Sequence, residues 1–345
     1  MKRALIVCPG RGSYDRASLG QLQDRSEAAT QVITACDAYR EANGRPAITT
    51  LDAEEKYRTT KHVAGEHASL LTFCCSLADL ADLRDEFEIV GVAGNSMGFY
   101  TALAASGALS LGDAIALVDT MGDYQVKNVI GGQLLYPISD ADWRFDNELE
   151  GTVNRALADA NAAGHRAFWS IRLGGYAVLG ADRGGLKFLL NALPGEKRGS
   201  REFPIQLPLH SAFHTRLLAD TSERALRELS HLEFRAPRVP LVDGRGVVWR
   251  PRWADPDALY RYTLGHQVVE TFDFTTAAHT ALRHCGADIV IALGPGNAMG
   301  GPLARILVSG GWNGIRTRAD LDMRQQSDDP LLLSFGVTLQ RRQLV

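Results

Sequence analysis

Short apolar runs alternate along this chain with longer stretches in which apolar residues recur every three or four positions. The runs at 4–8 and 88–93 are typical of buried strands, and a third strand is predicted in GADIVIALGPGNAMGG. Helical spacing occurs around 24–43 and 66–84, through SMGFYTALAASGAL, and again after Ser110, which is expected to cap that helix. Strand, turn and helix in repeated order predict a parallel α/β sheet with helices on its faces.

The pattern changes between residues 130 and 207. A strand (GGQLLYPIS), a helix, two strands that turn at Gly174-Gly175, a short helix and a last strand (SREFPIQLPL) follow one another. This β-α-β-β-α-β order is that of the ferredoxin-like motif. We therefore expect a small domain of residues 130–207, inserted into a large domain of residues 1–129 and 208–345. The polar tail TRADLDMRQQSDDP is expected at the surface.

Composition argues against several classes of function. The 345 residues carry a formal net charge of −3, so no strong positive field favours nucleic acid or an acidic membrane surface. The five cysteines show no metal-binding spacing, and we expect buried thiols in a reducing compartment and no metal site. The first apolar run is too short for a signal peptide, and none reaches membrane-spanning length. The sequence thus predicts a cytoplasmic protein.

Gly94-Asn95-Ser96-Met97-Gly98 lies between a predicted strand and a predicted helix, the context of a nucleophile elbow. The flanking glycines permit a tight turn that holds the serine in a strained conformation. Ser96 would then lie at a helix N-terminus, where free N–H groups favour a developing negative charge. A glycine-bounded helix cap would have the same sequence, so both interpretations stay open on this pattern alone.

A serine hydroxyl becomes a good nucleophile only when a base removes its proton. Among nine histidines, His210 and His214 follow directly after a predicted strand, and the pattern does not choose between them. An oxyanion hole needs two N–H groups aimed at one point. Met97 can supply one, and the glycine loop CPGRGS can supply the other. A phosphate-binding role for this loop is disfavoured because no Walker lysine follows.

Five stretches occur in the order IVCPGRGSY, GEHASLLTFCCSL, GNSMGFY, LPLHSAFHTRLL and IALGPGNAMGGPL. Together they resemble the motifs of the malonyl-CoA:acyl carrier protein transacylase family and of related polyketide synthase acyltransferase domains. The resemblance implies an α/β-hydrolase-like parallel-sheet domain with an inserted ferredoxin-like small domain. It also places the family's histidine on His214, because LPLHSAFHTRLL aligns with the family motif without gaps.

The resemblance implies a ping-pong transfer of an acyl group. Ser96 would attack an acyl-CoA thioester with His214 as the base, and the phosphopantetheine thiol of an acyl carrier protein would then attack the acyl-serine. Coenzyme A and phosphopantetheine are substrates here, and no cofactor is implied. The oxyanion hole would be the backbone amides of Arg11 and Met97, and a backbone carbonyl within residues 267–273 would orient His214.

The departures from the family bear on the acyl group. Malonyl-selective members carry an arginine in a helix motif LVxxRGxxM, and this arginine pairs bidentately with the malonyl carboxylate. The aligned position here is Met121, and Asp119 and Asp123 nearby are expected to add repulsion. The sequence therefore predicts an uncharged, apolar acyl group. Arg11, which replaces a glutamine of the family, offers the alternative that a loop arginine reaches the carboxylate.

Asn95 and Phe99 replace a histidine and an acidic residue of the family, and we expect both to make the pocket mouth less charged. Two other functions stay open: a hydrolase that releases acyl groups from carrier proteins, and a catalytically silent scaffold that docks a carrier protein. An acidic carrier protein needs a basic docking face. Candidate residues in or near the small domain are Arg172, Arg183, Lys187, Lys197 and Arg201.

Overall fold

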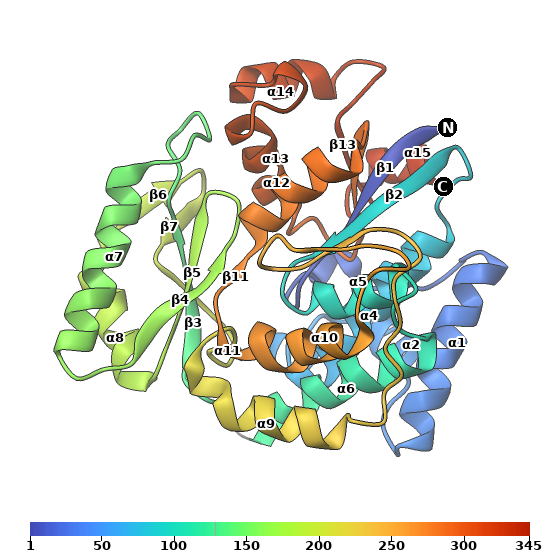
Figure 1. Ribbon diagram of the computed structural model, residues 1–345, viewed down its shortest axis with the longest axis horizontal. Coiled ribbons are helices and arrows are strands. Elements are labelled where there is room, and N and C mark those ends of the chain that lie inside the picture. Colours follow the sequence, from blue (N-terminus) through green and yellow to red (C-terminus); the bar gives the residue numbers. More distant parts are fainter. Residues whose placement is uncertain (128) are drawn as a thin grey trace.

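The chain forms two β-sheets (Figure 1). The structure is a computed structural model that describes residues 1–127 and 129–345, and for residues 125–127 it describes the backbone alone. The larger sheet contains β1 (Lys2–Cys8), β2 (Phe87–Gly94), β9 (Leu241–Val242), β10 (Val248–Trp249), β12 (Ile289–Ala292) and β13 (Leu332–Ser334). Their order across the sheet is β10-β9-β2-β1-β12-β13. β10 is antiparallel to β9, whereas the other neighbouring strands are parallel.

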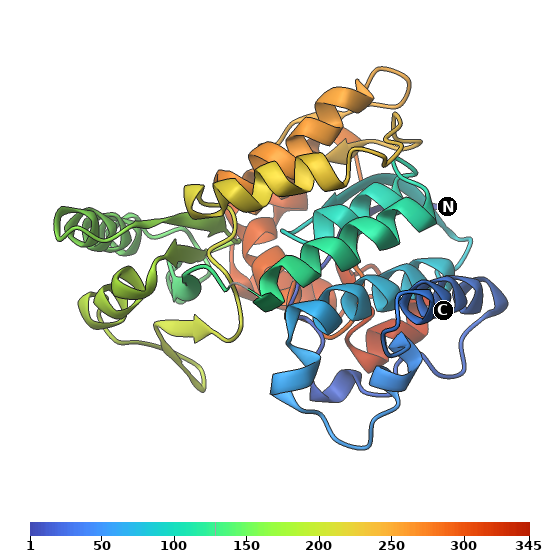
Figure 2. The same cartoon turned by 90° about the horizontal axis from the view of Figure 1, so that it is seen from below.

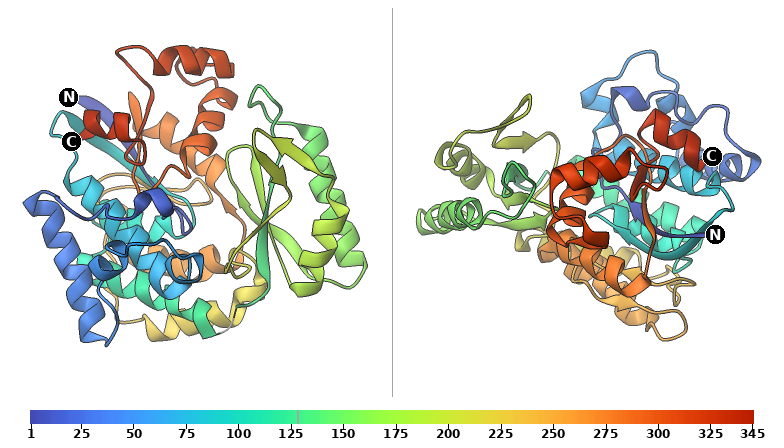
Figure 3. Two further views of the ribbon diagram at one scale, coloured as in Figure 1. Left: turned by 180° about the vertical axis from the view of Figure 1, so that it is seen from behind. Right: turned by 90° about the horizontal axis from the view of Figure 1, so that it is seen from above.

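The centre of this sheet is buried on both faces. Every residue of β12 and the last five residues of β1 are buried, as expected for parallel strands covered by helices on both sides. Helices α5 (Gly98–Ala105) and α12 (Phe274–Cys285) pack against β1 and β2, and α4 (Gly65–Ala81) packs against α1 (Glu27–Ala42) and α6 (Leu111–Lys127). Figures 2 and 3 show how these helices surround the sheet. The mixed α/β organisation expected from the sequence is confirmed.

Other helices and turns connect these elements or cover the outside. The longer ones are α9 (Ala219–Glu228), α13 (Gly300–Ser309), α14 (Arg318–Gln325) and α15 (Thr338–Leu344), and the shorter ones are α2 (Ile48–Asp52), α3 (Thr59–His62), α10 (Pro256–Arg261) and α11 (Gln267–Val269). Single turns form η1 (Arg16–Ser18), η2 (Arg216–Leu218), η3 (Tyr262–His266) and η4 (Trp312–Gly314). The polar tail predicted at the surface contains α14. Both chain ends lie on the same side of the molecule (Figure 3).

The second sheet stands beside the larger one, on the left in Figure 1. Its strands are β3 (Gly132–Pro137), β4 (Ala167–Arg172), β5 (Tyr176–Ala181), β8 (Ile205–Leu207) and β11 (Phe272–Asp273), in the order β11-β4-β5-β3-β8. Helices α7 (Asn147–Ala162) and α8 (Arg183–Ala192) pack on this sheet and on each other, around a separate hydrophobic core. A hairpin of β6 (Glu196–Arg198) and β7 (Arg201–Phe203) precedes β8.

Several local expectations agree with these elements. The hydroxyl of Ser110 accepts a hydrogen bond from the backbone N–H of Asp113 at 3.1 Å, so it caps α6 as predicted. Gly174 and Gly175 both have positive φ in the turn from β4 to β5. The chain returns to the second sheet at β11, outside residues 130–207, and the proposed domain boundaries stay a prediction. Across residues 1–127 and 129–345, no helix combines the length and apolar character needed to span a bilayer.

Candidate active site

Ser96 lies in the turn between β2 and α5 with a backbone φ of +56°. This left-handed conformation is uncommon for a residue with a side chain, and it stores strain. A side chain on Gly94 would overlap the backbone of Gly98, and one on Gly98 would overlap the carbonyl of Cys8 at the end of β1. Glycine is therefore required on both sides of Ser96, because three backbone segments meet there.

His214 is the hydrogen-bond partner of Ser96. Its Nε2 lies 2.7 Å from the Ser96 Oγ, and its Nδ1 lies 2.5 Å from the carbonyl oxygen of Gln267. Because a carbonyl oxygen can only accept, Nδ1 carries the proton and Nε2 is left to accept from the Ser96 hydroxyl. The orienting carbonyl thus lies at the first residue of the range 267–273 expected from the family resemblance. The pair has the geometry of a nucleophile with its base.

Burial keeps the His214 imidazole neutral. The residue is 2% exposed, and desolvation lowers its pKa to about 4, although the hydrogen bond to the Gln267 carbonyl acts in the opposite direction. A neutral imidazole is the form that can accept a proton. His210 lines the same cavity, but its Nδ1 pairs with the carbonyl of Pro208 at 2.8 Å. The two histidines left open by the sequence pattern therefore have different surroundings.

Arg11 and Met97 line the same cavity as Ser96. The loop after β1 touches the elbow, since a Cβ on Gly10 would lie 2.9 Å from the carbonyl oxygen of Asn95. The Arg11 guanidinium donates to the carbonyl of Leu209 at 2.7 Å. Burial lowers the pKa of Arg11 to about 9. The proposed role of the two backbone amides as an oxyanion hole stays a prediction.

The cavity beside Ser96 has a volume of about 320 Å³ and is walled by the second sheet on one side and by loops and helices around the larger sheet on the other. Its lining contains arginine at two positions, Arg11 and Arg201, and no aspartate or glutamate among the described residues. Much of the remaining wall is apolar. Apolar residues of this wall are Met97, Val118, Met121, Leu135, Ile171, Leu173, Val178, Leu207, Phe213 and Met299.

The substituted pocket residues divide into two groups. Met121 is 2% exposed and lines the cavity, as does Asn95. Phe99 does not line the cavity. Its fully buried ring packs edge-on against Tyr262, with 5.3 Å between ring centroids. The expectation that Phe99 belongs to the pocket mouth is therefore wrong, because its side chain, at the second residue of α5, points into the core.

The expected repulsion from Asp119 and Asp123 is wrong. Asp119 pairs with the Arg40 guanidinium at 3.0 Å and with that of Arg45 at 2.9 Å, and Arg45 also binds Asp123. Neither aspartate lines the cavity. The positive charges come from α1 and the segment after it, so the negative charges are neutralised by an interaction between α1 and α6 that the local sequence does not reveal.

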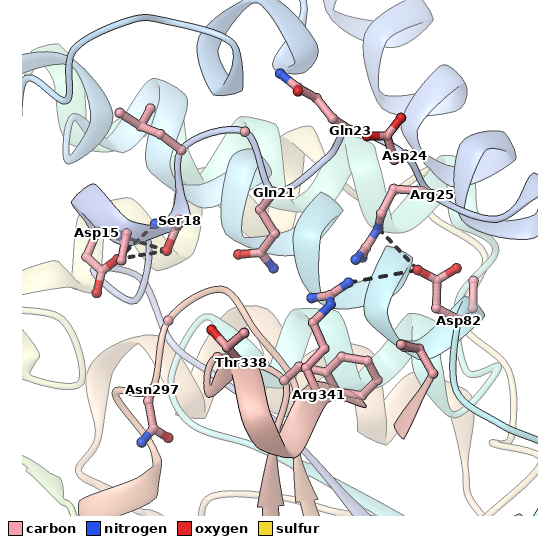
Figure 4. A pocket seen from close by; sticks show the side chains of 18 of the residues that line it. Asp15, Ser18, Gln21, Gln23, Asp24, Arg25, Asp82, Asn297, Thr338 and Arg341 are labelled. Atoms are coloured by element: carbon pink, nitrogen blue, oxygen red, sulfur yellow. Dashed lines mark hydrogen bonds and ion pairs between the residues drawn. The ribbon is translucent and has the colours of Figure 1, made fainter. Parts of the chain in front are cut away.

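A larger cavity, of about 760 Å³, lies away from Ser96 (Figure 4). Arg25 and Arg341 meet Asp82 there, and both arginines also pair with Asp79 beneath it, at 2.7 and 2.9 Å. Its described lining contains no residue of the Ser96–His214 pair. Size therefore does not identify the site, and the chemistry favours the smaller cavity.

The side chains of two glutamines near the pair were not anticipated. Gln267 donates through its side-chain Nε2 to the carbonyl oxygen of Ser96 at 3.0 Å, so this residue contacts both members of the pair. Gln133 on β3 lines the cavity and is 4% exposed. A polar residue within the apolar run GGQLLYP was the available signal for Gln133. For the Gln267 side chain, the sequence offered none.

The candidate docking residues occupy different settings. Arg172 is paired with Glu150 at 2.7 Å and is thus partly neutralised. Arg183 and Lys187 are exposed on α8, and Lys197 and Arg201 are exposed on the β6–β7 hairpin. Arg201 also lines the Ser96 cavity, whereas Arg183 and Lys187 lie on α8, which packs on the face of the second sheet opposite the cavity.

Comparison with known proteins gives distant relatives of this chain. No protein-family model matches the chain. The malonyl CoA-acyl carrier protein transacylase of Bacillus subtilis (strain 168) is 23% identical over 312 residues, which cover 89% of this chain and 91% of the relative. At this low identity, the chain is similar to the malonyl-CoA:acyl carrier protein transacylase and polyketide synthase acyltransferase family.

Solved structures of the family share the fold. The acyl-carrier-protein S-malonyltransferase of Burkholderia pseudomallei 1710b matches with a TM-score of 0.73 and 20% identity over 99% of both chains. The malonyl-transacylase PlMCAT, solved in complex with the type II polyketide synthase acyl carrier protein AntF, matches with a TM-score of 0.70 and 20% identity, covering 89% of this chain and 93% of that chain. The family fold is thus retained at low identity.

Proposed function

We propose that this chain transfers an acyl group from coenzyme A, through an ester on Ser96, to the phosphopantetheine thiol of an acyl carrier protein. The carrying observation is the hydrogen-bond chain from the Ser96 hydroxyl to His214 Nε2, and from His214 Nδ1 to the Gln267 carbonyl. These two hydrogen bonds fix the tautomer of the imidazole, and they direct its basic nitrogen, Nε2, toward the hydroxyl of Ser96. Similarity to an acyltransferase family and the relatives' substrates support the same chemistry.

The reaction divides into two half-reactions of one kind. Ser96 Oγ forms a bond to the thioester carbonyl carbon while its proton passes to His214 Nε2. The carbon–sulfur bond then breaks, and His214 returns the proton to the departing coenzyme A thiolate. In the second half, His214 takes the proton of the phosphopantetheine thiol, the sulfur attacks the ester, and Ser96 is released with its proton restored. The backbone amides of Arg11 and Met97 would hold the oxyanion in both halves.

The acyl group we propose is uncharged. Met121 offers no counter-charge, and burying a carboxylate without a partner costs several kcal/mol. Arg11 is the competing candidate for a carboxylate partner: its Nη2 donates to the carbonyl of Leu209, whereas its Nη1 is buried without a hydrogen-bond partner. The apolar wall around Met121 fits an alkyl chain better than a malonyl carboxylate.

The acceptor we propose is an acyl carrier protein that approaches the second sheet. The complex of PlMCAT with AntF gives a precedent among structural neighbours. Exposed Arg201 and Lys197 would meet the acidic carrier next to the cavity that its arm must enter. We also propose that residues 130–207 form a ferredoxin-like unit inserted into an α/β-hydrolase-like unit, a division supported by the separate core of the second sheet.

Intact-protein mass spectrometry after mixing with acetyl-, butyryl- and malonyl-CoA tests this function. We expect acetyl and butyryl adducts that are absent from Ser96→Ala, and little malonyl adduct. Met121→Arg should gain malonyl loading, because the new guanidinium can pair with the carboxylate. The absence of any adduct on the wild-type chain would contradict the acyl-serine mechanism.

Two further results would redirect the proposal. A strong malonyl adduct that disappears in Arg11→Gln, while the acetyl adduct persists, would assign the carboxylate to Arg11. Free acid that accumulates in the presence of a holo carrier protein, without an acylated carrier, would instead assign a hydrolase.

A further inference from the structure

A small hydrogen-bond network surrounds Gln133 in the cavity wall. Its side-chain Nε2 lies 2.7 Å from the hydroxyl of Ser170 on β4 and 3.4 Å from the carbonyl oxygen of Phe213. The Ser170 hydroxyl donates to the same Phe213 carbonyl at 2.9 Å. Ser170 is fully buried. Since Phe213 directly precedes His214, this network also supports the backbone that carries the base.

The network fixes which way the Gln133 amide points. Ser170 uses its only proton on the Phe213 carbonyl, so its oxygen must accept from Gln133. The Nε2 group of Gln133 is therefore turned toward Ser170, and Oε1 is turned away from it. Within the described part of the chain, Oε1 accepts no hydrogen bond. It is also not one of the fully buried atoms that lack a partner, so part of its surface is accessible. Because Gln133 lines the Ser96 cavity, the accessible side is the cavity.

Oε1 is thus an acceptor in a largely apolar wall. Leu135 and Val178 lie on the neighbouring positions of the same sheet and line the same cavity. An acceptor enclosed by such groups favours a ligand that brings an N–H or O–H donor to it, because an unmatched ligand would leave it unpaired.

We propose that Gln133 Oε1 accepts a hydrogen bond from the acyl thioester substrate and thereby selects among substrates. This inference rests on the proposed acyl transfer and makes Gln133 a specificity-determining residue. The donor has two possible sources: the pantetheine amide N–H two carbons from the sulfur, present in coenzyme A and in the carrier arm, or a hydroxyl on the acyl chain. Both bring a donor within a few bonds of the carbonyl that Ser96 attacks.

The test compares acylation rates of Ser96 in the wild-type chain and in Gln133→Leu, measured by quenched intact-protein mass spectrometry. Four acyl thioesters distinguish the two sources of the hydrogen-bond donor: butyryl-CoA, 3-hydroxybutyryl-CoA, S-butyryl-N-acetylcysteamine and ethyl thiobutyrate. The last of these has neither amide nor hydroxyl. Gln206→Leu is the matched control, because Gln206 is exposed on the adjacent strand β8. Gln133→Met, a near-isosteric variant, replaces the leucine variant if the latter does not fold.

If the amide is the donor, Gln133→Leu should slow the three amide-bearing substrates about tenfold and leave ethyl thiobutyrate unchanged. If the hydroxyl is the donor, the wild type should prefer 3-hydroxybutyryl-CoA over butyryl-CoA, and Gln133→Leu should remove that preference. Equal rates for wild type and variant, or an equal loss on all four thioesters, would overturn the proposal. Absence of any wild-type adduct would instead refute the acyl transfer on which it rests.

Discussion

The pH profile of Ser96 acylation follows from the buried state of His214. The base must be neutral to take the serine proton, and its pKa is lowered to about 4 by burial. At pH 5.5, an imidazole of pKa 4 is about 97% neutral, whereas one of ordinary pKa 6.5 is about 9% neutral. We therefore expect the acylation rate at pH 5.5 to remain within about twofold of its value at pH 8, and to fall only toward pH 4.

The assay mixes the chain with butyryl-CoA at each pH, quenches with acid and measures the adduct by intact-protein mass spectrometry. Circular dichroism at each pH excludes acid unfolding as the cause of a decline. Ser96→Ala gives the background. A tenfold loss of rate between pH 7.5 and 5.5 with the fold intact would show that the imidazole titrates near its ordinary pKa, and would refute the argument from burial.

Three stability and activity predictions can be checked with urea unfolding and the same loading assay. Gly98→Ala should lower acylation at least a hundredfold, because the new methyl overlaps the Cys8 carbonyl and displaces the elbow; Gly112→Ala, where the methyl meets open space, should leave it unchanged. Arg40→Met should cost about 1–3 kcal/mol of unfolding free energy, since Oδ1 of the buried Asp119 loses its donor while Oδ2 keeps Arg45, and a loss below about 0.5 kcal/mol would contradict this. The unfolded chain takes up a proton on His214 as pH falls from 6.5, whereas the native chain does so only near pH 4. Relative to His214→Asn, the wild type should lose about 3 kcal/mol over that range, and parallel stability curves would contradict the linkage.

The sequence revealed the parts of the fold whose signal is local. The apolar runs of β1 and β2 are nearly continuous because parallel strands are covered on both faces. The elbow needs glycine at fixed spacing around Ser96, so it too is visible in a few letters. Shorter elements such as β13 and β6 were missed, because three residues give too little periodicity to distinguish a strand from a loop. The strand predicted in SREFPIQLPL is divided into β7 and β8.

What the sequence could not show depends on contacts between distant segments. Arg40 and Asp119 are separated by 79 positions, and only the packing of α1 on α6 makes them partners. The carbonyl that orients His214 was expected within a seven-residue range from the family resemblance, and the structure gives it as Gln267. Phe99 was interpreted from its distance to Ser96 along the chain, whereas its direction is decided by the rotation of α5.

The shared walls of the Ser96 cavity have a consequence for how this protein can diversify. The nucleophile lies in the loop after β2 of the larger sheet and its base in the loop after β8 of the second sheet, while Leu135, Ile171 and Val178 reach the cavity from within the second sheet. Substitutions in that sheet can therefore reshape the acyl chain that is accepted without touching the reacting atoms. A chimera that carries the second sheet of a relative should inherit that relative's substrate preference and keep its own catalytic pair. Selectivity and reactivity can then evolve on separate segments of one chain.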